Sequence, residues 1–411
     1  MDLILRNARI AGQPVPVADI GIKAGRIAAL EPGLVAPGRE IDLGGRLVSP
    51  GFVETHIHLD KSCILHRCGG GGDLNAAIQE VSQLKADFTA EDVYARGSRT
   101  IEKCIAQGTT HMRTHLELDP TVAMRSFEAV QQLVRDYAWA IDIEICAFPQ
   151  EGLLNNPGTD ELLVEAMKRG AHLIGGAPYV DSNPHGQIDR IFQIAREFDT
   201  DIDLHLDFGT DGSTLDLDYV CELTTRYGRG GRVAIGHVTK LAHVPPEQFA
   251  GAARRMADAG VALTVLPSTD LYLMGRDRDH AHTRGVAHAH ELLHHGVNCS
   301  LSTNNVLNPF TPFGDCSLIR MANLNANICH IGSAADTEEC FNMVTTRSAQ
   351  LMNIHDYGIA VGNKADLVVI DAATPRAAVA ELAPVLMGFK DGVQVLNREP
   401  AQILRPGGGQ A

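Results

Sequence analysis

The sequence predicts an α/β protein, a (β/α)8 TIM barrel with a small β-sandwich formed by the N- and C-terminal segments. The first observation is that eight apolar segments of strand length alternate with amphipathic helical segments. These strand segments are apolar on both faces, which is typical of a parallel sheet covered by helices. The second observation is that both ends of the chain consist of short alternating strand-like pieces. A doubly wound open sheet is the structural alternative.

The eight predicted barrel strands are short apolar runs bounded by turn residues. They lie near 51–58, 109–117, 141–148, 171–177, 202–208, 232–238, 261–267 and 297–304. Helices are expected between them at 90–107, 121–136, 158–169, 184–197, 213–226, 245–259 and 284–295. Start signals support several of these helices, among them Thr89 and the Pro245-Pro246 pair.

The two ends of the chain differ from the middle. Residues 2–49 and 359–398 alternate in strand-like pieces that are separated by glycine turns. Because each half-sheet is too small to close a core alone, we expect the two halves to pack together. The predicted domains are therefore a composite β-sandwich of residues 1–49 and 356–411 and a (β/α)8 barrel of residues 50–355. The tail Pro406–Gly409 is expected to be disordered.

Composition limits the partners. The formal net charge of −15 argues against nucleic acids and anionic membranes. The chain contains no run of roughly 18 uncharged apolar residues that would predict a transmembrane helix. Asp2 stands where a signal peptide needs basic residues, and the nine cysteines show no paired C-x-x-C spacing. These features favour a cytoplasmic protein with reduced thiols.

The most specific motif is His56-Ile57-His58 within GFVETHIHLDK, at the end of the first predicted barrel strand. Residues two apart in a strand point to the same side, so both imidazoles can face the barrel axis. Barrel enzymes assemble their active sites at the C-terminal ends of the strands. The motif therefore predicts a metal site, and two packed structural histidines are the alternative.

Two further histidines stand at the ends of later strands, His205 in DLHLDF and His237 in AIGHVTK. We predict that His56, His58 and His205 bind one divalent ion, Zn2+ or Fe2+, with positions left for water and substrate. His237 is predicted to act as an acid or base, or to orient the substrate. The alternative for both later residues is a hydrogen-bonded core histidine.

The chain resembles the amidohydrolase superfamily, and within it the group of cytosine deaminases and N-isopropylammelide isopropylaminohydrolases. The matching pieces are PGFVETHIHLDKS, MRTHLEL, ICAFPQEG, HLDF, GHVTK, STNNVLNPF and DYGIAVGNKADLVVID. The resemblance implies that His56, His58 and His205 bind one metal ion and that His237 positions the water or the substrate. It implies that Gln150 hydrogen-bonds the substrate ring, and that the chain is a possible homo-oligomer.

Two positions depart from the family pattern. Asn304 stands where the family has an aspartate that binds the metal and accepts a proton, and Asn305 follows it. An amide oxygen can still bind a metal, so Asn304 is kept as a candidate ligand and catalytic residue. Phe208 stands where cytosine deaminases have a glutamate that protonates the ring. Phe208 and Asn305 are therefore predicted to contact a different substrate.

Two charged residues are candidates to replace the missing acid groups. Lys61 follows the histidine pair, matches a lysine of the N-isopropylammelide enzymes and could titrate near a cation. Its alternative role is that of a salt-bridged lysine at the rim. By strand alternation Asp207 shares the His205 side, and its alternative role is that of a helix-capping residue. Asp60 and Asp270 are weaker candidates of the same kind.

Together these features predict a metal-dependent hydrolase that cleaves a non-peptide C–N bond of a small, nitrogen-heterocyclic substrate through a metal-activated water. A cyclic amide or imide hydrolase on the same site is the second interpretation. A ligand-binding barrel that has lost the catalytic acid groups is the third, because two proton-handling residues are absent.

Overall fold

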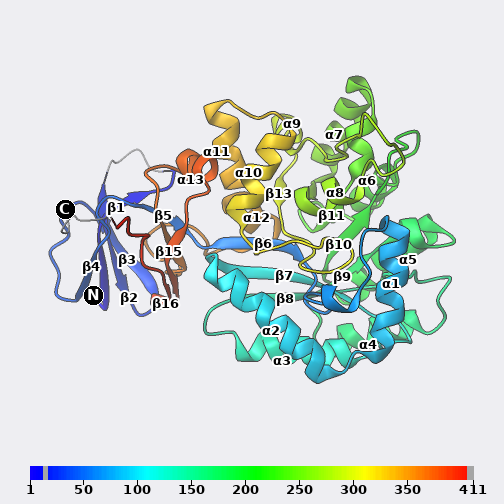
Figure 1. Ribbon diagram of the computed structural model, residues 1–411, viewed down its shortest axis with the longest axis horizontal. Coiled ribbons are helices and arrows are strands. Elements are labelled where there is room, and N and C mark those ends of the chain that lie inside the picture. Colours follow the sequence, from blue (N-terminus) through cyan, green and yellow to red (C-terminus); the bar gives the residue numbers. More distant parts are fainter. Residues whose placement is uncertain (13–16, 405–411) are drawn as a thin grey trace.

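The computed structural model describes residues 1–12 and 17–404, so the tail Pro406–Gly409 lies outside the described part. Its larger sheet consists of eight parallel strands in the order β13-β12-β11-β10-β9-β8-β7-β6 (Figure 1). The strands are β6 (Phe52–Ile57), β7 (Thr109–Glu117), β8 (Asp142–Phe148), β9 (Leu173–Gly176), β10 (Asp201–Leu206), β11 (Val233–His237), β12 (Val261–Val265) and β13 (Cys299–Leu301). Seven of them fall inside the predicted strand segments, and β10 begins one residue before its segment. The predicted barrel is confirmed.

Backbone hydrogen bonds just beyond β13 close the barrel. The N–H of Asn304 donates to the carbonyl oxygen of His56 at 2.8 Å, and the N–H of His58 donates to the carbonyl oxygen of Asn304 at 3.1 Å. One step earlier, the N–H of Thr55 donates to Ser302 Oγ at 2.9 Å. The first and last strands therefore meet at the C-terminal end of the barrel, where the predicted site residues lie.

Seven helices confirm the predicted helical segments. They are α2 (Ala90–Ala106), α3 (Arg125–Asp136), α4 (Thr159–Lys168), α5 (Pro184–Glu197), α6 (Leu217–Arg226), α7 (Pro246–Ala259) and α9 (Ala289–His294). The sequence did not predict α1 (Leu74–Leu84), α8 (Pro267–Leu273), α10 (Leu318–Ile328), α11 (Ala334–Asn342), α12 (Thr346–Leu351) and α13 (Pro375–Glu381). Helices α1 and α8 lie in the connections that follow β6 and β12, close to the mouth of the barrel. None of the described helices is long and apolar enough to cross a bilayer.

The smaller sheet joins the two ends of the chain and lies beside the barrel in Figure 1. Its strands are β1 (Leu3–Ile10), β2 (Ala18–Lys23), β3 (Arg26–Glu31), β4 (Arg39–Asp42), β5 (Leu47–Pro50), β14 (Leu367–Ile370), β15 (Val385–Lys390) and β16 (Val393–Asn397). Strand β1 pairs with β2 through its first residues and with β5 through Arg9 and Ile10. It therefore links the two leaves of the β-sandwich around a separate apolar core that includes Ile20, Leu367 and Phe389.

A buried lysine ties this sandwich to the barrel. Lys390, at the end of β15, lies with its Nζ 2.7 Å from Asp142 Oδ2 at the start of β8. The same Nζ lies 2.6 Å from Asp366 Oδ2, which precedes β14. Lys390 and Asp366 are both buried, so neither charge has water as an alternative partner.

We predict that Lys390→Met will lower the free energy of unfolding by roughly 3–5 kcal/mol, because it leaves the buried carboxylate of Asp366 without its cation. Denaturant unfolding measures the loss. The matched control is Lys364→Met, since Lys364 Nζ is half-exposed and lies 3.6 Å from Asp142 Oδ2. That change should cost about 1 kcal/mol or less. Equal losses in the two variants would contradict the assignment.

Candidate metal centre and active site

Three histidine nitrogens meet inside the C-terminal end of the barrel. His205 Nε2 lies 3.0 Å from His56 Nε2 and 3.3 Å from His58 Nε2. A tetrahedral ion with Zn–N bonds of about 2.0–2.1 Å holds its nitrogens about 3.3 Å apart. All three rings are buried. The two distances from His205 Nε2 therefore match the separation of nitrogens that bind one divalent ion.

The surroundings keep these imidazoles neutral, as metal binding requires. Burial lowers the pKa of all three well below the usual value, and the neighbouring imidazoles lower it further. The orientation of His58 is also set, because its Nδ1 bonds to the carbonyl oxygen of His115 at 3.0 Å. A carbonyl oxygen can only accept, so Nδ1 carries the proton, and the lone pair of Nε2 is free on the side of His205 Nε2.

A fourth histidine stands beside this cluster. His237, the last residue of β11, has Nδ1 2.6 Å from Asp270 Oδ1 on α8. A ligand atom of His237 also lies within 4.8 Å of those of His56 and His205. Burial raises the pKa of Asp270, and His237 opposes that rise. The Asp270 contact uses Nδ1 and leaves Nε2 available for acid–base work or for a metal.

The sequence reasoning missed His115, which is completely buried behind the cluster. Its ring stacks on that of His56 with a centroid distance of 3.8 Å. Its Nε2 lies 3.4 Å from Asp203 Oδ1, and the other carboxylate oxygen accepts from Arg113 at 2.9 Å. The period-two spacing of arginine and histidine in MRTHLEL was the signal that could have found this group.

An inner pocket opens beside the histidines, with a volume of about 10 Å³. Eight of the predicted site residues line it: His58, Lys61, Gln150, His205, Phe208, His237, Asn304 and Asn305. It is completed by residues that the sequence did not single out, namely Leu74, Tyr179, Thr269, Leu273 and Phe310. The structure thus brings the predicted residues together from both ends of the barrel sequence.

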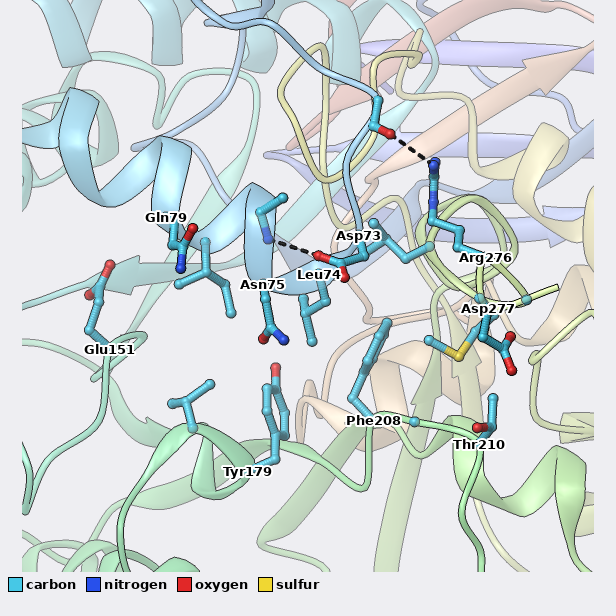
Figure 2. Close-up of a pocket in the computed structure, with 18 residues that line it drawn as sticks. Asp73, Leu74, Asn75, Gln79, Glu151, Tyr179, Phe208, Thr210, Arg276 and Asp277 are labelled. Carbon is cyan, nitrogen blue, oxygen red and sulfur yellow. Dashed lines mark hydrogen bonds between the residues drawn. The ribbon is translucent and has the colours of Figure 1, made fainter. Parts of the chain in front are cut away.

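An outer cleft of about 1230 Å³ lies above the inner pocket. Leu74, Tyr179, Phe208 and Leu273 line both spaces, and we call these four residues the collar. Figure 2 shows Tyr179 projecting toward Asn75 at the start of α1, with Phe208 standing beside it. The collar separates the closed inner pocket from the open cleft.

Lys61 is part of a buried ionic network. Its Nζ lies 2.6 Å from Glu117 Oε1 and donates to Gln150 Oε1 at 3.1 Å. The second oxygen of Glu117 lies 2.6 Å from Nζ of Lys85, which also pairs with Glu151. Burial acts to raise the pKa of Glu117, but the charges of Lys61 and Lys85 lower it overall. Lys61 is thus ion-paired, but it lies inside the site and not at its rim.

The sequence profile of the Amidohydrolase family matches residues 75–396. The chain belongs to this family. The assignment confirms the prediction of a hydrolase that acts on carbon–nitrogen bonds other than peptide bonds. A divalent metal ion is the cofactor that fits both the family and the histidine cluster.

Similar proteins cover almost the whole amidohydrolase. N-isopropylammelide isopropyl amidohydrolase of Pseudomonas sp. (strain ADP) is 29% identical over 97% of this chain and 98% of its own length. Pterin deaminase of Rhizobium rhizogenes is 31% identical over 86% and 82%. The crystal structure of 5-methylcytosine deaminase from Klebsiella pneumoniae with 5-fluorocytosine is 28% identical, with a TM-score of 0.94 over 98% and 100%. The first and the third of these relatives support the predicted subgroup.

Asp207 is the predicted catalytic residue of this amidohydrolase that the inner pocket does not include. Its carboxylate oxygens accept from the backbone N–H groups of Asp216 and Leu217, at 3.0 and 2.9 Å, at the start of α6. Strand β10 ends at Leu206, and Asp207 has a left-handed φ of 48°. The alternation that predicted a pocket-facing side chain therefore does not reach residue 207, and the geometry favours the capping role.

We predict that His205→Ala will abolish binding of about one divalent ion per chain, because two imidazoles leave the site incomplete. Metal analysis of the purified, reconstituted protein measures this loss. His185→Ala is the matched control, since the His185 side chain is 54% exposed and outside the pocket. Full metal content in His205→Ala would contradict the ligand assignment.

Proposed function

We propose that this amidohydrolase binds Zn2+ or Fe2+ through His56, His58 and His205 and hydrolyses a C–N bond of a small nitrogen heterocycle, releasing ammonia or an amine. The observation that carries the proposal is the convergence of the three Nε2 atoms beside the inner pocket. When bound, such an ion supplies a Lewis acid that makes a water molecule nucleophilic near neutral pH.

His237 is the residue best placed to move protons in this reaction. Asp270 holds Nδ1, so the lone pair of Nε2 can take a proton from the attacking water and later deliver it to the leaving nitrogen. The buried carboxylate of Asp270 stabilises the imidazolium that forms in between. This pair supplies the acid–base function that Asn304 cannot provide.

Lys61 and Gln150 would hold the substrate ring. Both line the inner pocket, and their mutual hydrogen bond fixes the amide of Gln150. Relatives that carry the names pterin deaminase and 5-methylcytosine deaminase support a ring substrate. Phe208 adds an apolar wall that suits a ring or an alkyl substituent.

A cyclic amide or imide hydrolase is the second candidate. Among the described residues that line the inner pocket, none is an aspartate or a glutamate. Deamination of a pyrimidine-like ring benefits from a carboxyl group that protonates a ring nitrogen, whereas attack on a cyclic amide begins at a carbonyl carbon. The absence of a carboxyl group from the described lining therefore favours ring opening of a cyclic amide or imide.

We expect His237→Ala to lower kcat by about 10²–10⁴ while the metal content stays near that of the unmodified chain, because the residue transfers protons and does not hold the ion. Steady-state kinetics and metal analysis on one preparation measure both quantities. His243→Ala, six residues along, is the matched control and should be neutral. If metal is lost together with activity, His237 is a ligand and this assignment fails.

The function itself is tested by incubating the metal-loaded chain with triazines, pyrimidines and pterins. Ammonia or amine release that is absent from His205→Ala would support the first candidate. A ring-opened acid without free ammonia would support the second. Binding without either product would favour the ligand-binding barrel and would overturn the proposed hydrolysis.

A further inference from the structure

Three neighbouring asparagine amides run from the loop after β13 to the inner pocket. Asn308 Oδ1 accepts from the backbone N–H groups of Phe310 and Thr311, at 3.0 and 3.1 Å. Because a backbone N–H can only donate, the Asn308 atom at this position must be oxygen. Its Nδ2 therefore lies at the other end of the amide, where it donates to Asn305 Oδ1 at 2.7 Å.

The same logic fixes the next two amides. Asn305 uses its oxygen to accept from Asn308, so its Nδ2 is the atom that donates to Asn304 Oδ1 at 2.9 Å. All three side chains are at least 97% buried, so exchange with water does not loosen the sequence of bonds. The hydrogen-bond chain therefore has one direction, set by two backbone N–H groups at its far end.

This direction determines what Asn304 offers to the pocket. Its oxygen is already an acceptor for Asn305, and its NH2 group is the other arm of the planar amide. Within residues 1–12 and 17–404, no group accepts a hydrogen bond from this NH2. Asn304 lines the inner pocket beside His205 and His237. The atom that Asn304 leaves free for a partner is thus a hydrogen-bond donor, where the family pattern has an acceptor.

A second amide in the pocket is oriented in the same way. Gln150 Oε1 accepts from the ammonium of Lys61, which can only donate. Gln150 Nε2 is consequently turned away from Lys61, and this buried atom has no hydrogen-bond partner among the described residues. Gln150 is itself 97% buried and lines the pocket. An unpaired buried donor costs about 1–3 kcal/mol unless a ligand supplies an acceptor.

We propose that Asn304 donates a hydrogen bond to an oxygen of the substrate, that Asn305 and Asn308 are positioning residues that fix its direction, and that the site selects oxo-substituted rings over amino-substituted ones. The proposal rests on the proposed function for the location of the substrate. A carbonyl oxygen can accept from both amides and from Lys61. An amino group at the same position would face N–H against N–H and leave these donors unpaired.

The test uses two rings of the same shape, cyanuric acid with three exocyclic oxygens and melamine with three amino groups. Calorimetric titration of the metal-loaded chain should give a Kd for cyanuric acid at least about tenfold below that for melamine, a difference of about 1.4 kcal/mol. Asn305→Asp still accepts from Asn308 but can no longer donate, so the Asn304 amide should turn its oxygen to the pocket. This variant should lose the preference or reverse it.

Asn304→Asp puts an acceptor in the pocket directly and should have the same effect on the ratio of the two Kd values. The side-chain volume stays nearly the same in this variant, so it tests the donor role of Asn304 even if Asn305→Asp fails to fold. The matched control is Asn75→Asp, which adds the same charge in the outer cleft (Figure 2) and should leave the ratio unchanged. Circular dichroism and metal analysis establish that each variant is folded and loaded.

An unchanged Kd ratio in folded, metal-loaded Asn304→Asp would overturn the proposal. An increase in metal affinity without a change in the ratio would also overturn it, because it would indicate that Asn304 serves the ion through its oxygen. Product analysis separates this result from the proposed function. Selectivity for the oxo-substituted ring without hydrolysis would overturn only the proposed hydrolase activity. Hydrolysis with an unchanged ratio of the two Kd values would overturn only the donor role of Asn304.

Discussion

The backbone pairing of Asn304 with His56 and His58 is the constraint on which the site depends. It closes the barrel between its first and last strands. The carbonyl of His56 and the N–H of His58 both hydrogen-bond to the backbone of this one residue. A slip of one residue in this pairing would turn both imidazoles away from the axis, because side chains alternate along a strand. The same residue then starts the chain of amides, so closure of the barrel and polarity of the pocket are set together.

The site also depends on charges that are paired inside the protein. Glu117 lies between two buried ammonium groups, those of Lys61 and Lys85. Neither lysine could stay charged there alone, since an unpaired ion in the interior costs several kcal/mol. Lys85 follows α1, whose first residue belongs to the collar. The network therefore connects Lys61 in the inner pocket with the residue that follows helix α1.

The sequence predicted the barrel strands and the histidine cluster because both follow from short-range periodicity. Two histidines in one strand share a side whatever the rest of the chain does. Asp207 shows the limit of that rule, since the strand ends one residue before it. The stacking of His115 and the direction of the Asn304 amide could not be predicted, because they depend on contacts with Asp203 and with the backbone at Phe310. Such contacts exist only in the folded chain.

The collar has a consequence for the timing of the reaction. With the inner pocket at about 10 Å³, the space of a single water, no ring can enter until at least one of Leu74, Tyr179, Phe208 and Leu273 moves aside. Capture of substrate is then a two-step event whose observed rate levels off at high substrate concentration, at the opening rate of the collar. Departure of the larger product must pass the same constriction. Residues that touch neither the metal nor the scissile bond can therefore set the turnover rate.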